Sequence, residues 1–225
     1  MKLLDRLSLE DDQPTKAKET EIVVYSKINH FDGLEEAQSI EHHLQYETRF
    51  ENKGRSRVRR VTKGDQVSYF FTMKIPTDDA GLFSTTEYTV EVDVDFFEGF
   101  GAIATRKIDK TRYVFTSQKV DMTLASENTE ANVNLPHVKY EIDVFNNDQG
   151  NPVDWCKIDI EIDGLLDHLS AELPEAGIGK LKLKVSHLPF KPTDSILMTN
   201  ASEEQQAFVK QLWDTQFLLG GNTTE

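Results

Sequence analysis

The sequence predicts an α+β fold built mainly from antiparallel strands, with a barrel among the architectures that fit. About nine segments alternate apolar residues with polar or charged ones, the pattern of a strand with one apolar face. Short connections rich in Gly, Asn and Asp separate successive segments, as in hairpins. Only a few segments have helical spacing. With 225 residues, the chain can bury a sizeable core.

The predicted elements follow in chain order. Residues 1–18 read as a flexible lead-in, and a single domain is expected over 19–219. The β-branched and aromatic run 19–28 opens this domain as a strand. Residues 34–44 have the apolar spacing of a short acidic helix. Further strands, each bounded by turn residues, are expected over 45–51, 55–62, 66–75, 85–97, 103–116, 119–124, 138–145, 155–162 and 181–186.

Two helices are expected late in the chain. Residues 163–173 form a short helical segment that stops before Pro174. Residues 202–219 begin with Ser202 as an N-cap, carry acids in the first turn and have apolar residues at helical spacing. The second segment is therefore predicted to be an amphipathic C-terminal helix.

The charge of the chain is strongly acidic but unevenly distributed. The formal net charge is −14, which argues against general binding of duplex nucleic acid or of an anionic membrane. Six basic residues and no acid lie between Lys53 and Lys63. This block predicts a local anion site.

The prediction of cellular location rests on three features that the sequence lacks: a pair of cysteines, a membrane span and a signal region. Cys156 is the only cysteine, so no disulfide can form within the chain. No apolar run approaches the ~20 residues of a membrane span, and the first residues lack a long apolar signal region. We therefore expect a cytoplasmic protein without a membrane partner. The oligomeric state is left open.

The polar faces of the predicted strands are sorted by sign. Residues of one parity share a face of a strand, so Arg55, Arg57 and Arg59 lie together. Acidic residues align in the same way in 138–145 and 155–162. One interpretation is the ordinary solvated face of an antiparallel sheet. The other is a charged interior that holds an anion with Lys and Arg and a hard divalent cation with carboxylates. A polyphosphate with its metal ion would meet both requirements.

Three segments in the second half of the chain carry a family resemblance. Residues 106–113 resemble an R-x-x-x-K-x-R-y strand, 138–145 a w-x-[ED]-x-D-x-F strand, and 157–161 an E-x-E strand, in that order. Upstream, 57–59 is similar to an R-x-R strand and 71–74 to an L-T-x-K strand. Together these resemble the adenylate cyclase/thiamine triphosphatase (CYTH-like) superfamily of triphosphate tunnel metalloenzymes, over roughly residues 19–163.

The opening signature of that family, E-x-E-x-K, is altered here. Glu19 and Glu21 supply both acids, but Val23 stands where the Lys belongs. Lys27, on the same face, is a candidate replacement. Residues 45–49 are a rival match, with Gln for the first acid and Arg for the Lys. Chain order favours the first match. The alteration bears on hydrolysis more than on ligand binding.

The resemblance implies a closed antiparallel β-barrel with peripheral helices, which would grip a triphosphate with the help of Mg²⁺ or Mn²⁺. The catalytic residues would be Asp159 and Glu161, acting through a metal-bound water. The phosphate-binding residues would be Arg57, Arg59, Lys74, Arg106, Lys110, Arg112 and, less directly, Lys182. The metal ligands would be Glu19, Glu21, Glu141, Asp143, Asp159 and Glu161.

The expected ligand is a nucleotide, an inorganic or organic triphosphate, or an RNA 5′-triphosphate, and the expected reaction is metal-dependent hydrolysis. Three alternatives stay open. The protein would bind or sequester nucleotides without turnover, or act as a class IV type adenylate cyclase in which a ribose hydroxyl attacks. In the third, the charged faces are merely solvated and the protein serves interactions.

Overall fold

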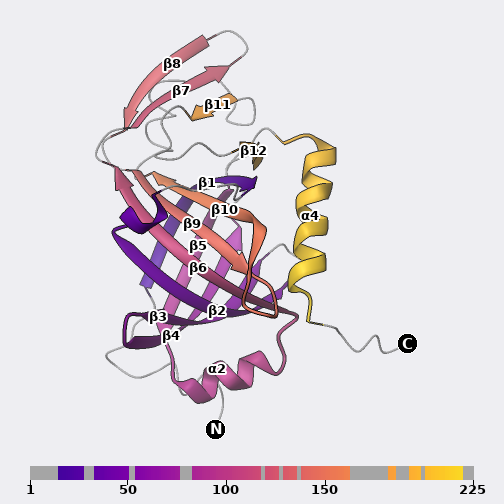
Figure 1. Ribbon diagram of the computed structural model, residues 1–225. Helices are drawn as coiled ribbons and strands as arrows, with labels where there is room; N and C mark the ends of the chain where they lie inside the picture. Colours follow the sequence, from indigo (N-terminus) through magenta and orange to yellow (C-terminus); the bar gives the residue numbers. More distant parts are fainter. Residues whose placement is uncertain are drawn as a thin grey trace.

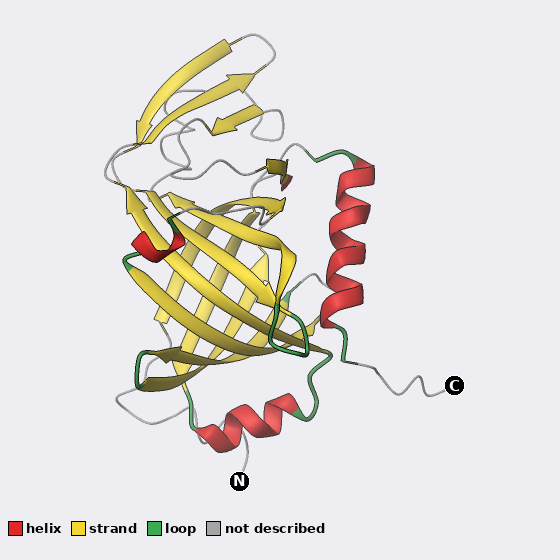
Figure 2. Cartoon of the chain, in the orientation of Figure 1, coloured by secondary structure: helices red, strands yellow, loops and turns green. Residues whose placement is uncertain are grey.

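The computed structural model describes residues 15–27, 33–50, 54–76, 83–117, 120–126, 129–135, 138–162, 182–185, 193–198 and 201–219. Within these residues the protein has an α+β fold dominated by antiparallel sheet, as predicted. Figures 1 and 2 show one large, strongly curved sheet with helix α4 alongside it and a smaller sheet beyond one end.

The large sheet has nine strands in the order β10-β9-β6-β2-β3-β4-β5-β1-β12. Neighbouring strands in it are antiparallel. Strand β1 also pairs with β10, from Glu21 opposite Glu161 to Lys27 opposite Trp155. The pairings therefore lead from β1 through seven other strands and back to β1. The nine strands are β1 (Thr15–Lys27), β2 (Ser39–Arg49), β3 (Arg55–Lys63), β4 (Gln66–Pro76), β5 (Phe83–Glu91), β6 (Arg106–Ser117), β9 (Val138–Asn146), β10 (Pro152–Ile162) and β12 (Thr193–Leu197).

The small sheet has the order β11-β7-β8. It comprises β7 (Val120–Ser126), β8 (Thr129–Leu135) and β11 (Lys182–Val185). Because β7 and β8 lie in the chain between β6 and β9, this sheet is attached at the end of the large sheet where β6 stops and β9 starts.

The faces of the large sheet differ in polarity. Tyr140, Ile142 and Val144 of β9 lie on the outer face and are at most 6% exposed. The alternate residues Glu141 and Asp143 lie on the inner face and are nevertheless buried. A merely solvated polar face is therefore excluded for this strand, and the charges belong to an interior.

Helix α2 (Val94–Gly101) covers part of the outer face. Phe97 packs between Tyr46 of β2 and Tyr69 of β4, with ring centroids 5.2 and 5.3 Å apart. The helix corrects the sequence prediction of one long strand over 85–97. Asp93 ends the alternating run because its side chain accepts a hydrogen bond from the Phe96 amide at 2.7 Å and so caps a helix.

Helix α4 (Glu203–Phe217) confirms the predicted C-terminal helix. Ser202 and Gln205 form a capping box, in which each side chain bonds to the other residue's backbone. The ring of Trp213 packs on Phe145 with centroids 5.6 Å apart. Its Nε1–H donates to Tyr25 Oη at 2.7 Å. These contacts place α4 against the inner face at the ends of β1 and β9.

Other boundaries also differ from the predictions. The expected helix over 34–44 is a 3-10 turn, η1 (Leu34–Glu36), followed by β2 from Ser39. Pairing of β2 with both β3 and β6 outweighs the local helical spacing. Strand β1 begins at Thr15, inside the expected lead-in. Strands β8 and β12 were not predicted. The expected helix over 163–173 and residues 1–14 lie outside the described residues.

Within the described part of the chain, no helix has the length and apolar character needed to cross a membrane.

Candidate anion-binding cavity

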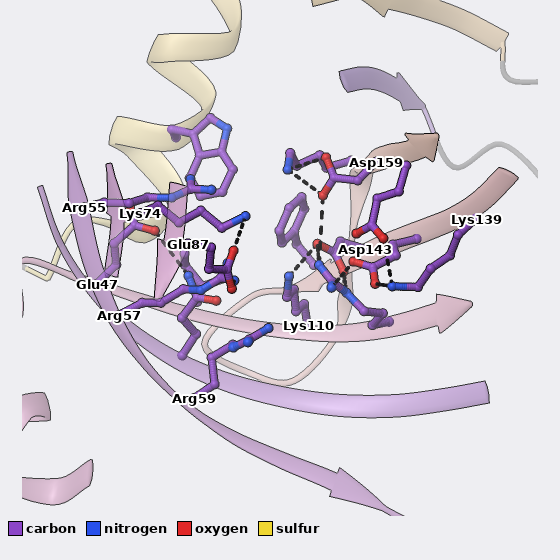
Figure 3. A pocket seen from close by; sticks show the side chains of 18 residues that line it. Glu47, Arg55, Arg57, Arg59, Lys74, Glu87, Lys110, Lys139, Asp143 and Asp159 are labelled. Atoms are coloured by element: carbon purple, nitrogen blue, oxygen red, sulfur yellow. Dashed lines mark hydrogen bonds and ion pairs between the residues drawn. The ribbon is translucent and has the colours of Figure 1, made fainter. Parts of the chain in front are cut away.

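The inner face of the large sheet encloses a cavity of about 230 Å³, lined by seven strands and α4. Among the residues whose side chains the structure describes, eight Lys and Arg and six Asp and Glu line it. Figure 3 shows these side chains on two facing walls. The cations are Arg55, Arg57, Arg59, Lys74, Lys110, Arg112, Lys139 and Lys157. The carboxylates are Glu47, Glu87, Glu141, Asp143, Asp159 and Glu161.

Strand pairing explains why residues far apart in the sequence meet here. Directly opposed residues of neighbouring strands share a face. Arg112 of β6 lies opposite Asp143 of β9, which in turn lies opposite Lys157 of β10. On the facing wall, Lys74 of β4 lies between Arg55 and Glu87. Because every second residue of a strand points to the same face, charged residues at alternate positions of one strand follow one another along the cavity.

One wall, formed by β6, β9 and β10, is a network of ion pairs. Arg112 donates from Nε and Nη2 to both carboxylate oxygens of Asp143, at 2.7 and 2.8 Å, and from Nη1 to Glu141. Lys110 also donates to Asp143. Burial opposes ionisation of Asp143, but Arg112 and Lys110 hold its pKa well below the usual range. Lys157 donates to Asp159 at 2.6 Å.

Lys139 extends this network toward the end of β10. Its Nζ contacts Glu141 and Glu161, the latter at 3.0 Å. Burial lowers the pKa of Lys139, but the two carboxylates outweigh burial and raise it.

The described side chains of the opposite wall, formed by β2 to β5, include more cations than acids. Arg57 and Lys74 both contact the carboxylate of Glu87, at 3.4 and 2.7 Å. Glu47, which is 1% exposed, accepts from Arg49 at 2.9 Å and from the Gln45 amide at 3.2 Å. Figure 3 shows Arg57, Arg59 and Lys74 on the side of the cavity that faces Asp143 and Asp159.

Arg59 is the least compensated cation of this wall. Among the described residues its guanidinium meets no carboxylate within 4.0 Å, and it has a hydrogen bond only to Thr72 Oγ1, at 3.5 Å. Burial, Arg57 and Arg112 lower the pKa of Arg59 to about 9. Burial and Arg112 likewise lower the pKa of Lys110 to about 7, despite its bond to Asp143. Both side chains would be stabilised by added negative charge in the cavity.

Most of the sequence-predicted site residues lie together at this cavity. Arg106 does not join them. Arg106 donates to Asp214 of α4 at 2.6 Å and does not line the cavity. Lys182 lies opposite Ala125 in the small sheet. The residues placed on the cavity are Arg57, Arg59, Lys74, Lys110, Arg112, Glu141, Asp143, Asp159 and Glu161.

The two acids of the altered signature lie in β1. By backbone register, Glu19 is opposite Thr85 of β5 and Glu21 is opposite Glu161 of β10. The candidate replacement for the missing lysine, Lys27, has its Nζ 5.9 Å from the ring centroid of Trp155 and is absent from the cavity lining.

Several lining residues were not predicted, although the sequence carries a signal for them. Lys139 and Lys157 have the same parity as Glu141 and Asp159, so they share those residues' inward face. Arg55 extends the row of Arg57 and Arg59 in the same way. The rival signature 45–49, set aside on chain order, supplies Gln45 and Glu47 to the lining. Glu87 belongs to a row of acids in the predicted strand 85–97 that resembles an acidic strand of the same family, but it was not assigned to the site. Trp213 came from a segment that was read only as a helix.

The carboxylates have the hard oxygen donors that Mg²⁺ or Mn²⁺ prefers. In the described part of the chain, however, no three Asp, Glu, His or Cys residues form a group arranged to hold a metal ion. Glu141, Asp143, Asp159 and Glu161 each pair with a Lys or Arg instead.

Comparison with solved structures adds a structural likeness. No protein-family model and no curated protein matches this chain. Among solved structures, the PH1819 protein from Pyrococcus horikoshii OT3 superimposes with a TM-score of 0.43 at 18% identity. The superposition covers 84% of this chain and 99% of that one. A likeness of this size assigns neither a family nor an activity.

Proposed function

We propose that this protein binds a polyphosphate inside the large sheet, which acts as a closed antiparallel barrel. The pairing of β1 with β10 supports the closure, since it joins the two ends of an eight-strand series. A closed sheet would keep bulk water from the charged inner face and so strengthen its electrostatic interactions.

The under-compensated guanidinium of Arg59 is the observation that carries this proposal. Arg59 is half-buried, and holding a charge away from water without a partner is costly, so proteins ordinarily pair such groups. A phosphate group between Arg59 and Arg57 would supply that partner, and guanidinium forks bind phosphate oxygens in pairs. Lys74 and Arg112 line the same cavity and would share the charge.

The spacing of the cations favours an extended anion over a single phosphate. Arg55, Arg57 and Arg59 follow one another on the inner face of β3. Alternate residues of a strand are roughly 7 Å apart, so the row offers successive positions to successive phosphates. A triphosphate provides such a row of negative groups.

Metal-dependent hydrolysis is a second proposal, favoured by the facing carboxylate wall. Glu141, Asp159 and Glu161 would hold the ion, and the register of β1 brings the backbone of Glu21 opposite Glu161. A bound Mg²⁺ or Mn²⁺ would supply charge neutralisation and Lewis-acid activation. Lys139 and Lys157 would then release carboxylates that they now neutralise and turn toward phosphate oxygens. Asp159 and Glu161 would be the catalytic residues.

Calorimetry with inorganic tripolyphosphate in EDTA tests the binding proposal. We expect saturable binding that weakens as salt is raised, because the contacts are ionic. Arg112→Ala should abolish it. Arg60→Ala is the matched control, since Arg60 lies on β3 between Arg59 and Val61 but does not line the cavity. Absence of binding by the unmodified protein would refute the proposal.

Phosphate release from tripolyphosphate, ATP and RNA 5′-triphosphate, with Mg²⁺ or Mn²⁺, tests the hydrolysis proposal. Glu161→Gln should remove release and keep binding. Binding without release by the unmodified protein identifies a nucleotide-binding or sequestering protein, and cyclic AMP formed from ATP would identify a cyclase.

A further inference from the structure

Two lysines of the cavity wall occupy related positions on strands β9 and β10. On the inner face, β9 presents Lys139 followed by Glu141, and β10 presents Lys157 followed by Asp159. Because the two strands are antiparallel, Lys139 lies opposite Glu161 and Glu141 lies opposite Asp159. Two acidic residues therefore face each other across the strand pair, and like charges in such positions repel unless a cation lies beside them.

Lys139 supplies such a cation. Its Nζ donates to Glu141 and, at 3.0 Å, to Glu161, so one ammonium group joins carboxylates of two strands. In Figure 3 its side chain reaches toward the wall that carries Asp143 and Asp159. An ammonium is a compact charge with three donors. Carboxylate oxygens are also the ligands that Mg²⁺ and Mn²⁺ prefer, so Lys139 uses acceptors that a divalent ion would need.

The two lysines differ in how firmly the wall holds them. The side chain of Lys157 is 13% exposed and contacts Asp159, whereas the side chain of Lys139 is 42% exposed. Lys139 also lines a second cavity, of about 500 Å³, which shares Glu141 and other lining residues with the first. A long, flexible side chain in this position can turn away from the carboxylates and remain at the site. Lys139 is therefore the exchangeable cation of the pair.

We infer that Lys139 is a built-in counter-cation, which takes the place of a divalent metal ion between Glu141 and Glu161 and keeps such an ion out until it turns away. This inference rests on the metal site of the hydrolysis proposal and adds the residue that controls entry of the ion. While Lys139 holds the two carboxylates, they have a counter-charge without a metal ion. Removing the charge of Lys139 should consequently tighten the binding of a divalent ion.

Titration with Mn²⁺ alone, followed by electron paramagnetic resonance, tests the inference. Lys139→Gln should bind Mn²⁺ at least about tenfold more tightly than the unmodified protein, since no neighbouring ammonium opposes the ion. Lys139→Arg keeps the charge and should leave the affinity within about twofold. Lys107→Gln is the matched control, because it also removes one positive charge, but Lys107 is exposed on β6 and does not line the cavity.

Thermal unfolding with and without Mn²⁺ gives a second readout that depends on no activity. Mn²⁺ should raise the Tm of Lys139→Gln more than that of the unmodified protein, because an ion that binds only the folded chain stabilises it more the tighter it binds. Lys139→Met removes the same charge and keeps the apolar length of the side chain. It should give the same result as Lys139→Gln in both measurements.

The outcomes separate this inference from the proposed function. If the unmodified protein and Lys139→Gln bind Mn²⁺ equally tightly, the inference is wrong and the metal site of the hydrolysis proposal stands. If neither binds Mn²⁺, both the inference and that metal site fail, while polyphosphate binding, which is measured in EDTA, is unaffected. If Lys107→Gln tightens Mn²⁺ binding as much as Lys139→Gln does, the net charge explains the effect and the inference is wrong.

Discussion

Replacing Arg59 with methionine should make the protein more stable and a poorer ligand binder. The side chain is a charged group at a cavity with no carboxylate partner among the described residues, and Arg57 and Arg112 repel it. Methionine fills much of the same space without the charge. Because stability should rise while ligand affinity falls, this variant tests whether the charge of Arg59 serves ligand binding and not folding.

The magnitudes follow from the lowered pKa of Arg59. Its fall from 12.5 to about 9 corresponds to an upper bound on the order of 5 kcal/mol for keeping the group charged in the fold. Water in the cavity screens part of this, so we expect a net gain of about 1–2 kcal/mol in the free energy of unfolding. For a chain of this size the gain raises the Tm by roughly 2–8 °C. Loss of a charged hydrogen bond to phosphate should weaken tripolyphosphate binding ~10- to 100-fold.

Thermal or urea unfolding measures the first effect, and calorimetry with tripolyphosphate measures the second. Arg60→Met is the control, since the neighbouring residue does not line the cavity. A lower unfolding free energy together with unchanged affinity would show that Arg59 is a structural residue and would refute the reasoning.

Three further predictions concern other members of the site. Tripolyphosphate binding at pH 8 should be accompanied by the uptake of as much as about one proton. Burial and Arg112 lower the pKa of Lys110 to about 7, and a bound anion should raise that pKa, so Lys110 becomes protonated on binding. At pH 6 Lys110 is already protonated, and the uptake by Lys110 should vanish. Heats of binding in buffers of different ionisation enthalpy measure this uptake, and equal heats in all buffers at pH 8 would contradict it. Asp143→Ala should lower the free energy of unfolding by about 3–5 kcal/mol in urea titrations, because it strands two buried cations; a loss below about 1 kcal/mol would argue against the network. Arg106→Met should leave tripolyphosphate affinity unchanged and reduce stability by up to about 1 kcal/mol, through the lost pair with Asp214; a weaker affinity would return Arg106 to the phosphate site.

The sequence predicted strands best where local pattern and sheet pairing agree. Strand β3 and helix α4 begin and end within a few residues of expectation, because a turn bounds one and a capping box begins the other. The pattern misled at 34–44 and at 85–97. In the first, pairing with two neighbouring strands turned a helical spacing into β2. In the second, a single side-chain cap at Asp93 ended an alternation that otherwise continued.

The sequence predicted the charged character of the cavity better than it predicted which residues line it. Alternation assigned Arg57, Lys110 and Asp143 to inward faces correctly, since parity alone decides a face. Parity does not say how far along its strand, and so along the cavity, a residue lies. Arg106 therefore has the right face but lies at the α4 end, where Asp214 takes its guanidinium. Nor does the sequence show that Lys139 and Lys157 would neutralise the predicted metal ligands.

The pairing of β1 with β10 also determines when the sheet can be completed during folding. By backbone register Glu21 lies opposite Glu161, so this pairing joins residues 140 positions apart in the chain, and contacts of such long range form slowly. During synthesis, β1 is made long before β10, and the edge of β1 that pairs with β10 stays unpaired until β10 has been made. Unpaired edges of this kind recruit strands from other chains. A chain truncated before Pro152 would lack β10 altogether, and we expect it to aggregate rather than to form a smaller working sheet.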